Sequence, residues 1–399
     1  MYRGDEATQH YLKIIQTIAS CSTDAGGPSR SVSALAAATA SQNCEVELVT
    51  LDAGTPKNEF VLPPEHLVKT NLCSCQNPFQ KKIQWSPEFS KTLNRLVRNA
   101  KQVLIHDNGV WLPTNHSAAA VARRQRVPLI ISPRGMLTQW SWNFRRFKKR
   151  AAWLLYQKRD LLSARVLHAT SRAEADDLRA LGLKQPIAVI PNGVELPMIQ
   201  KPEIRSQKSE VKIALFLSRI HPKKGLMDLV AAWDAVRPAG WKVVVAGGDE
   251  LNHRAEVEVE IQRRGLSGHF QFIGAVGDAQ KWEIYRAADL FILPTKSENF
   301  GIVIAEALAS GVPVITTRAT PWEELEKHQC GWWIETGVEP LLKALHQATA
   351  LSDVERNAMG RRGRLLIENN YSWPKIAREM RNVYEWILGG GEKPECIIN

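Results

Sequence analysis

The chain has 399 residues, of which 44% are apolar and 23% charged, and its formal net charge is +11. It is long enough for two hydrophobic cores, since single domains usually have about 100–200 residues. No apolar run approaches the roughly 20 residues of a membrane-spanning helix, and residues 1–6 lack the layout of a signal peptide, so we expect a cytoplasmic protein. Only Cys73 and Cys75 of the six cysteines are close in sequence, without a second pair or a nearby histidine, which argues against a zinc site.

Apolar, β-branched runs alternate with helical segments through the first half of the chain. We expect strands at residues 12–16, 46–50, 103–105, 128–131, 166–169 and 188–190, with a helix at 31–42. Such alternation predicts a parallel sheet covered by helices on both faces.

The second half repeats this pattern after a polar, proline-containing segment. Here we expect strands at residues 213–217, 242–246, 270–272, 290–293 and 314–316. We interpret 196–208 as a linker between a domain of residues 1–195 and a domain of residues 209–370.

Ligands of open parallel sheets bind beyond the carboxyl ends of the strands, so two facing domains create a cleft with a site on each wall. Gly26 and Gly27 follow the first expected strand and precede a helix. Their amides are able to approach a phosphate or a sugar hydroxyl, although an ordinary tight turn explains them equally well. The glycine pattern of a dinucleotide-binding domain is absent, which argues against an NAD enzyme.

The positive charge is unevenly distributed along the chain. Residues 1–200 contain 26 Lys and Arg against 15 Asp and Glu, whereas residues 201–399 contain 26 of each kind. Much of the excess lies in residues 145–159, a helix-compatible segment that mixes cations with aromatic and aliphatic side chains. Such segments bind anionic membrane surfaces or acidic ligands, or pack their apolar side into the domain. No nucleic-acid-binding motif accompanies the charge.

Glu298 and Glu306 flank the start of an apolar helix that follows the expected strand at 290–293. A strand that ends in a glycine-containing turn and enters a helix directs unpaired amides and the helix dipole at one point, which suits a phosphate. On a continuous helix the two glutamates are separated by about 12 Å, enough to hold hydroxyls at opposite ends of a sugar-diphosphate-ribose ligand. The alternative is a pair of solvated or salt-bridged surface charges.

Residues 295–314 resemble the E-x7-E signature of retaining family 4 glycosyltransferases, which have the GT-B fold. Further similarities to this family lie, in the family's order, at residues 189–195, 217–225, 272–276 and 285–290. The resemblance implies an α/β protein with two Rossmann-like domains that face each other across a cleft. It also implies that a helix at 371–388 returns to the first domain and leaves 389–399 as a tail.

The resemblance also implies residue roles. The motif positions of Arg219 and Lys224 are those that bind the donor diphosphate, Glu298 contacts the donor sugar, and Glu306 holds the ribose. Further donor contacts are expected at Asn299, Phe300, Gly301 and Gly274. In this family, retention is explained by front-face attack, in which a phosphate oxygen takes the acceptor proton. We expect no cofactor, and also no metal, because no metal-ligand cluster such as Asp-x-Asp stands beside the diphosphate loop in the sequence.

One position departs from the family pattern. Many members carry a histidine after a first-domain strand, where this chain has Arg134. His106, at the end of another strand, is a second candidate for that place, and the alternative is a buried, hydrogen-bonded structural histidine. Arg134 is expected to contact donor phosphate or an anionic acceptor, or else to pair with an acid of the fold.

These observations predict a retaining, metal-independent hexosyltransferase. Its donor is a nucleotide-diphosphate sugar, and its acceptor is a glycan or a lipid-diphosphate-linked molecule of bacterial polysaccharide or lipopolysaccharide assembly. The segment at 145–159 predicts peripheral contact with the inner face of the plasma membrane. Two alternatives remain, a nucleotide-sugar epimerase of the same fold and a non-catalytic membrane-surface scaffold.

Overall fold

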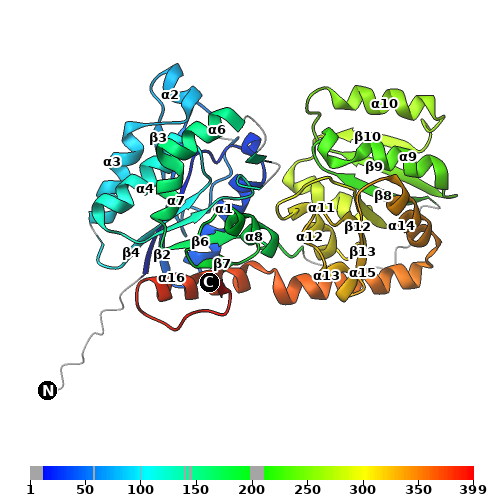
Figure 1. The fold of residues 1–399 in the computed structure, drawn as a ribbon. Coiled ribbons are helices and arrows are strands. Elements are labelled where there is room, and N and C mark those ends of the chain that lie inside the picture. Colours follow the sequence, from blue (N-terminus) through cyan, green and yellow to red (C-terminus); the bar gives the residue numbers. More distant parts are fainter. Residues whose placement is uncertain (1–11, 57–58, 99, 139–140, 143–145, 198–210) are drawn as a thin grey trace. The chain divides into compact units, whose positions relative to one another are not determined.

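A computed structural model describes residues 12–56, 59–98, 100–138, 141–142, 146–197 and 211–399. Two compact units are formed (Figure 1): unit 1 runs to Gly193 and includes Trp373–Asn399, and unit 2 spans Val194–Ser372. Most of the expected linker, 196–208, lies outside the described residues, as do residues 1–6 and Arg145.

Unit 1 contains an eight-stranded sheet of order β14-β7-β6-β5-β4-β1-β2-β3, parallel except for β14. Its strands are β1 (Leu12–Ile18), β2 (Cys44–Asp52), β3 (Lys69–Ser74), β4 (Val103–Asn108), β5 (Leu129–Ser132), β6 (Val166–Ala169), β7 (Ile187–Val189) and β14 (Ile397–Ile398). All six expected strands are confirmed. The sequence did not reveal β3 and β14, because one is a largely polar edge strand and the other has two residues.

Helices cover both faces of this sheet, because alternate residues of each strand point to opposite sides. Ile14 and Leu104 pack with α1 (Gly27–Ala40) and α16 (Trp373–Ile387), which contact each other. Ile15 and Ile105 belong to the core on the other face. That face is covered by α3 (Pro87–Arg98), α4 (Pro113–Gln125), α7 (Lys158–Leu162) and α8 (Arg172–Ala180). The remaining elements of unit 1 are α2 (Pro78–Ile83), α6 (Arg146–Ala152), the 3-10 turn η1 (Thr23–Ala25) and the π-helical turn η3 (Trp153–Gln157).

Unit 2 contains a fully parallel six-stranded sheet of order β10-β9-β8-β11-β12-β13. Its strands are β8 (Lys212–Leu217), β9 (Trp241–Ala246), β10 (Phe270–Gly274), β11 (Leu290–Leu293), β12 (Val314–Thr317) and β13 (Gly331–Ile334). The five expected strands are confirmed. The half-buried edge strand β13 went unrecognised, because its four residues begin with glycine and show no alternation of apolar and polar side chains.

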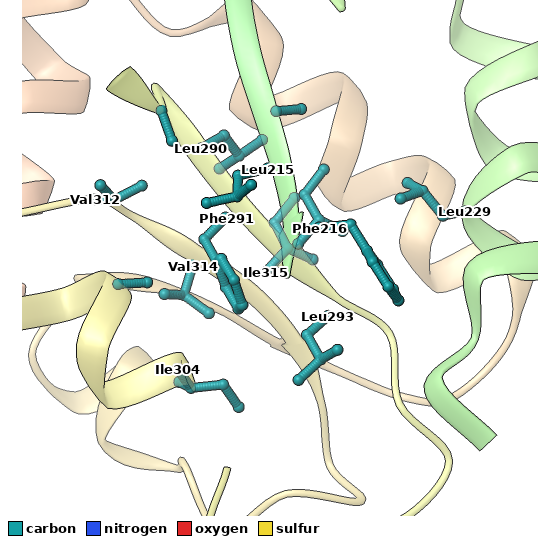
Figure 2. Close-up of a cluster of buried hydrophobic side chains, with 14 of the residues drawn as sticks. Leu215, Phe216, Leu229, Leu290, Phe291, Leu293, Ile304, Val312, Val314 and Ile315 are labelled. Carbon is teal, nitrogen blue, oxygen red and sulfur yellow. The ribbon is translucent and has the colours of Figure 1, made fainter. Parts of the chain in front are cut away.

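The centre of unit 2 is an aliphatic and aromatic core between the sheet and its helices. Figure 2 shows Phe216 of β8, Phe291 of β11 and Ile315 of β12 among these buried side chains. The helical elements of this unit are η4 (Pro222–Lys224), α9 (Leu226–Val236), α10 (His253–Arg263), α11 (Asp278–Ala287), α12 (Ile302–Ala309), α13 (Glu324–Lys327), α14 (Val338–Ala350) and α15 (Asp353–Asn370). Both units are therefore Rossmann-like α/β domains, as the sequence predicted.

Candidate active site

The loop between β8 and α9 carries the two cations expected at the donor diphosphate. Gly225 ends this loop with a φ of +76°, and a Cβ atom there would lie 2.0 Å from the carbonyl oxygen of Pro294. Only glycine tolerates that approach, so the loop lies directly against the end of β11. This contact holds Lys224, which is 8% exposed, beside the loop that follows β11.

Glu298 lies in that second loop and forms an ion pair with Lys224. The Glu298 amide donates to the carbonyl oxygen of Ala319 at 3.0 Å, which fixes the loop against the chain after β12. Gly301 then has a φ of +77° and caps α12. The expectation of one continuous helix through Glu298 and Glu306 is therefore wrong, because the left-handed backbone at Gly301 separates the loop from the helix.

Asn299, Phe300 and Gly301 form the last part of this loop, immediately before α12. Trp322 Nε1 donates to the carbonyl oxygen of Phe300 at 2.6 Å and anchors the turn in the unit 2 core. The first amides of a helix have no intrahelical acceptor, so the start of α12 is a suitable position for an anion.

Glu306 lies on α12 and is almost fully buried. Lys281 Nζ donates to its Oε1 at 2.8 Å, and the Tyr285 hydroxyl donates to its Oε2 at 3.0 Å. Burial, together with the adjacent Glu306, raises the pKa of Tyr285 well above its usual value, so its hydroxyl remains a donor. Sequence reasoning missed Lys281 and Tyr285 as partners of Glu306. Their spacing of four residues, which puts both on one face of α11, was the available signal.

Arg219 and Gly274 have partners other than the Lys224–Glu298 pair. The Arg219 side chain is 67% exposed and pairs with Glu250 at 2.8 Å. Gly274 ends β10, has a φ of +76°, and accepts a hydrogen bond from the Gly247 amide at 2.7 Å. Arg219 is thus free of the buried pair and accessible to a ligand.

In unit 1, Gly26 and Gly27 lie where the sequence placed them, between β1 and α1. Gly26 has a φ of +79°, and α1 begins at Gly27. A Cβ atom at either glycine would have no heavy atom within 4 Å, so the space beside this turn is open.

Arg134 is buried in unit 1 and makes hydrogen bonds to neutral oxygen atoms. Its Nη2 donates to Asn108 Oδ1 at 2.7 Å, and its Nη1 donates to Asn192 Oδ1 at 2.8 Å and to Ser31 Oγ at 3.2 Å. Burial lowers the pKa of Arg134 to about 10, and it remains charged at neutral pH. Through these bonds it joins the end of β4, helix α1 and the segment before Gly193.

His106 is fully buried and belongs to a chain of hydrogen bonds. Its Nε2 lies 2.6 Å from Ser132 Oγ, and that hydroxyl lies 2.6 Å from His168 Nδ1. His168 Nε2 donates to the carbonyl oxygen of Ile190 at 2.8 Å, and the Tyr384 hydroxyl lies 2.8 Å from His106 Nδ1. The Ile190 carbonyl only accepts, so His168 Nε2 carries a proton and His168 Nδ1 accepts from the Ser132 hydroxyl. Ser132 Oγ then accepts from His106 Nε2, and His106 Nδ1 accepts from the Tyr384 hydroxyl, which leaves both rings neutral.

Burial lowers the pKa of His106 well below its usual value and that of His168 to about 3. His106 therefore matches the alternative of a buried, hydrogen-bonded histidine, with both ring nitrogens engaged inside the unit. The sequence placed His106 at the end of a strand, whereas it lies inside β4, which continues to Asn108. The strand pattern gave no indication of Tyr384, which contributes from α16.

Two protein-family models match the chain. One, described as "Glycosyl transferase 4-like domain", matches residues 26–193, and the other, "Glycosyl transferases group 1", matches residues 199–366. The first falls in unit 1 and the second in unit 2.

Curated relatives include the phosphatidyl-myo-inositol mannosyltransferase of Mycobacterium leprae, 31% identical over 51% of this chain and 54% of that protein. The lipopolysaccharide core biosynthesis mannosyltransferase LpsB of Rhizobium meliloti is 30% identical over 52% of this chain and 62% of its own length. The chain thus spans between half and two thirds of the length of these relatives.

Solved structures share the fold over almost the whole chain. Sucrose-phosphate synthase from Thermosynechococcus elongatus has a TM-score of 0.73 at 19% identity and covers 95% of this chain and 100% of its own. Anabaena HepE, in complex with UDP and glucose, has a TM-score of 0.72 at 17% identity and covers 94% of this chain and 100% of its own. These structures show the GT-B fold, and the two family models, which match residues 26–193 and 199–366, show that the chain belongs to the family 4 type glycosyltransferases.

Proposed function

We propose that this protein transfers a hexose-type sugar from a nucleotide-diphosphate sugar to a glycan or lipid-linked acceptor, with retention of configuration. The observation that carries this proposal is the arrangement in unit 2, where Lys224 is paired with Glu298 and Lys281 with Glu306 on loops and helices at the carboxyl ends of the strands. Parallel sheets bind ligands at that edge.

The leaving diphosphate needs positive charge. Lys224 and the exposed Arg219 supply it, together with the first amides of α12. When Lys224 binds the diphosphate, its ammonium group leaves Glu298. The Glu298 carboxylate then becomes available to a hydroxyl of the donor sugar. The site therefore exchanges an internal ion pair for two ligand contacts.

Glu306 serves the other end of the donor. A carboxylate that already accepts from an ammonium and a phenol is held in a fixed orientation, and ribose hydroxyls bind to it as hydrogen-bond donors. In unit 1, Arg134 is held by Asn108, Asn192 and Ser31, and its positive charge favours an anionic ligand. The open turn at Gly26 and Gly27 is proposed to approach a phosphate or a sugar hydroxyl. Such an assignment leaves His106 as an internal support, because its ring is buried.

We further infer that the reaction needs no metal ion. Among the described residues, no group of three His, Cys, Asp or Glu side chains lies close enough to hold one. Lys224, Arg219 and the first amides of α12 supply the charge stabilisation that a metal provides in other sites. A phosphate oxygen of the departing nucleotide then takes the acceptor proton on the face that the nucleotide leaves.

Relatives support the choice of substrates. One curated relative named above is a phosphatidyl-myo-inositol mannosyltransferase, another is a mannosyltransferase of lipopolysaccharide core biosynthesis, and HepE was solved with UDP. We therefore propose bacterial cell-surface glycan assembly as the setting.

A membrane surface is the proposed location of the acceptor. The helical segment from α6 through α7 exposes Phe147, Leu154, Leu155 and Leu162, with Leu154 82% and Leu155 77% exposed. The spacing of these residues puts them on one helical face. An exposed apolar helical face of this kind lies on a lipid surface, and we propose that location for this face. None of the described helices is both long and apolar enough to cross a bilayer.

The charge around this face specifies an anionic surface. Lys148, Arg150, Lys158 and Arg159 are exposed beside the apolar side chains. Residues 108–159 contain eleven Lys and Arg but no Asp or Glu, so no acid of this segment opposes the attraction.

The test of the function is a binding and hydrolysis screen of the full chain against UDP-, GDP-, ADP- and dTDP-sugars. One of these donors is expected to bind and to be slowly hydrolysed, with the α-anomeric or β-anomeric configuration of the donor kept in the transfer product. Failure of every nucleoside diphosphate to bind would refute the proposal.

A further inference from the structure

Three tryptophans gather in unit 1 beyond the ends of β4 and β5. The ring centroids of Trp111 and Trp142 are 5.6 Å apart, those of Trp142 and Trp153 are 5.1 Å apart, and those of Trp111 and Trp153 are 6.4 Å apart. All three side chains are only partly buried. Aromatic rings at this level of exposure present an apolar face beside polar edges, which suits amphipathic ligands.

The backbone of Trp111 is held in an unfavourable conformation. Its φ is +81°, a left-handed value that is a true outlier for a bulky residue. The Trp111 amide donates to Gln157 Oε1 at 2.6 Å, its carbonyl accepts from the Tyr156 hydroxyl at 2.5 Å, and its Nε1 donates to the carbonyl oxygen of Met136 at 3.1 Å. Strain of this kind persists only where surrounding bonds enforce it, and it concentrates at ligand sites.

The residues that hold Trp111 come from a second irregular element. Tyr156 and Gln157 belong to η3, a π-helical turn inserted between α6 and α7. Single π-turns of this kind occur frequently at functional sites, because they redirect side chains that a regular helix would place elsewhere. Trp153 begins the same turn. One π-helical turn therefore orients Trp153 as well as Tyr156 and Gln157, which hold Trp111.

A cation lies over this cluster. Lys149 Nζ is 5.5 Å from the ring centroid of Trp111 and donates to the Ser141 carbonyl oxygen at 2.5 Å and to Ser141 Oγ at 3.0 Å. No carboxylate of the described residues lies within ion-pair distance of Lys149. Burial lowers its pKa, with no charged neighbour to oppose the shift. A desolvated ammonium group without a counter-ion favours an anionic ligand.

The cluster occupies the edge of the sheet where ligands bind. β4 ends at Asn108 and β5 ends at Ser132, so Trp111 and Met136 both lie a few residues beyond the carboxyl ends of parallel strands. Lys149 lies in α6 and Trp153 begins η3, and the exposed Leu154 and Leu155 follow directly in the same helical segment.

We propose that Trp111, Trp142, Trp153 and Lys149 bind the phosphate-linked sugar of the acceptor, with the sugar ring against the tryptophans and the phosphate at Lys149. The inference rests on the proposed function and names the acceptor as a glycosyl phosphate or diphosphate carried by a lipid. The apolar outer face of the segment then contacts the bilayer that carries the lipid.

The experiment measures binding to the full chain in lipid-free buffer, with the donor site filled by the nucleoside diphosphate found in the screen. The probes are a panel of monosaccharides, each carried on a short alkyl diphosphate and, in parallel, as an octyl glycoside. Saturation-transfer NMR and calorimetry compare wild type with Lys149→Met, Lys149→Arg and Trp153→Phe. Lys148→Met is the matched control, because Lys148 is the exposed neighbour of Lys149 on the same helix.

One sugar diphosphate is expected to bind about tenfold more weakly to Lys149→Met, as for the loss of a charge-assisted contact, and Lys149→Arg should restore most of the affinity. Trp153→Phe should weaken the diphosphate and the octyl glycoside of that sugar alike. Unchanged affinity in Lys149→Met and in Trp153→Phe, with melting temperatures like that of the control, would show that the cluster is only core packing. Inorganic pyrophosphate that binds as tightly as the sugar diphosphate would also overturn the proposal. Nucleotide binding is measured in the same samples. If wild type binds no nucleoside diphosphate, the proposed function fails; if it binds the nucleotide but not the sugar diphosphate, only the acceptor proposal fails.

Discussion

Lys224 and Glu298 form an ion pair although 74 residues separate them in sequence. The contact depends on Gly225, whose lack of a side chain lets the β8–α9 loop lie against Pro294. Each partner is thereby held in place by the other before a donor arrives. The pair is mostly buried, so its charges interact more strongly than they would in water.

The first prediction concerns the two cations. Lys224→Ala and Arg219→Ala should each lower sugar transfer by about two to three orders of magnitude, as when one charge-stabilising group is removed from a leaving-group site. Steady-state transfer at saturating donor measures the effect. Lys296→Ala is the control, because Lys296 lies in the loop after β11 but pairs with Asp228. Turnover near that of wild type in both Lys224→Ala and Arg219→Ala would mean that the diphosphate binds elsewhere.

The second prediction separates the two glutamates. Glu306→Gln should mainly raise the donor KM, since ribose binding is equal in the ground and transition states. Glu298→Gln should lower kcat while the free nucleoside diphosphate still binds, since charge develops on the sugar during transfer. Calorimetry with the free nucleotide beside steady-state kinetics distinguishes the two. Loss of nucleotide binding in Glu298→Gln, with binding intact in Glu306→Gln, would reverse the assignment.

The third prediction is that transfer survives chelation. Since Lys224, Arg219 and the start of α12 carry the stabilising charge, excess EDTA should leave the rate within about twofold of its starting value, a change of less than about 0.5 kcal/mol in barrier. Activity lost in EDTA and recovered with Mn²⁺ or Mg²⁺ would contradict the proposed mechanism.

The fourth prediction tests the membrane surface. Leu154→Asn combined with Leu155→Asn should reduce co-sedimentation with vesicles of phosphatidylglycerol and phosphatidylcholine, because two exposed apolar side chains leave the lipid. Binding of wild type should also fall as salt rises, and pure phosphatidylcholine vesicles should bind it weakly. Leu251→Asn is the control, since Leu251 is a similarly exposed leucine of unit 2. Equal sedimentation of all variants would exclude this face.

The fifth prediction concerns stability and pH. Because burial depresses the pKa of His106 and lowers that of His168 to about 3, the unfolded chain binds more protons than the folded one below about pH 6.5. Each ring therefore lowers the free energy of unfolding by about 1.4 kcal/mol per pH unit as the pH falls through this range.

Asp107 acts in the opposite direction. Burial raises its pKa to about 7, so its contribution to stability is present at low pH and is lost as the pH rises from about 4 to 7. Asp107→Asn should therefore make acid destabilisation steeper, by about 1.4 kcal/mol per pH unit. Urea unfolding between pH 4.5 and 6.5 measures the slope, and an unchanged slope would show that Asp107 is ionised in the folded chain.

The sequence by itself determined the order and type of most elements. Apolar runs predicted eleven strands that are present, because a strand buried on both faces by a parallel sheet must be apolar along its length. The sequence did not reveal β3, β13 and β14, because these strands lie at sheet edges or are very short and therefore lack a long apolar run. The glycines and charges of the unit 2 motifs were likewise visible, because turn geometry is a local property.

Only the tertiary structure decided which side chains meet. His106 and Tyr384 are 278 residues apart, and their contact exists because α16 returns to the sheet of unit 1. Lys281 reaches Glu306 from another helix, and Gln157 holds Trp111 from a π-helical turn that no periodicity indicates. Local patterns specify elements, whereas such contacts depend on strand order and helix packing, which bring together residues whose spacing in sequence carries no signal.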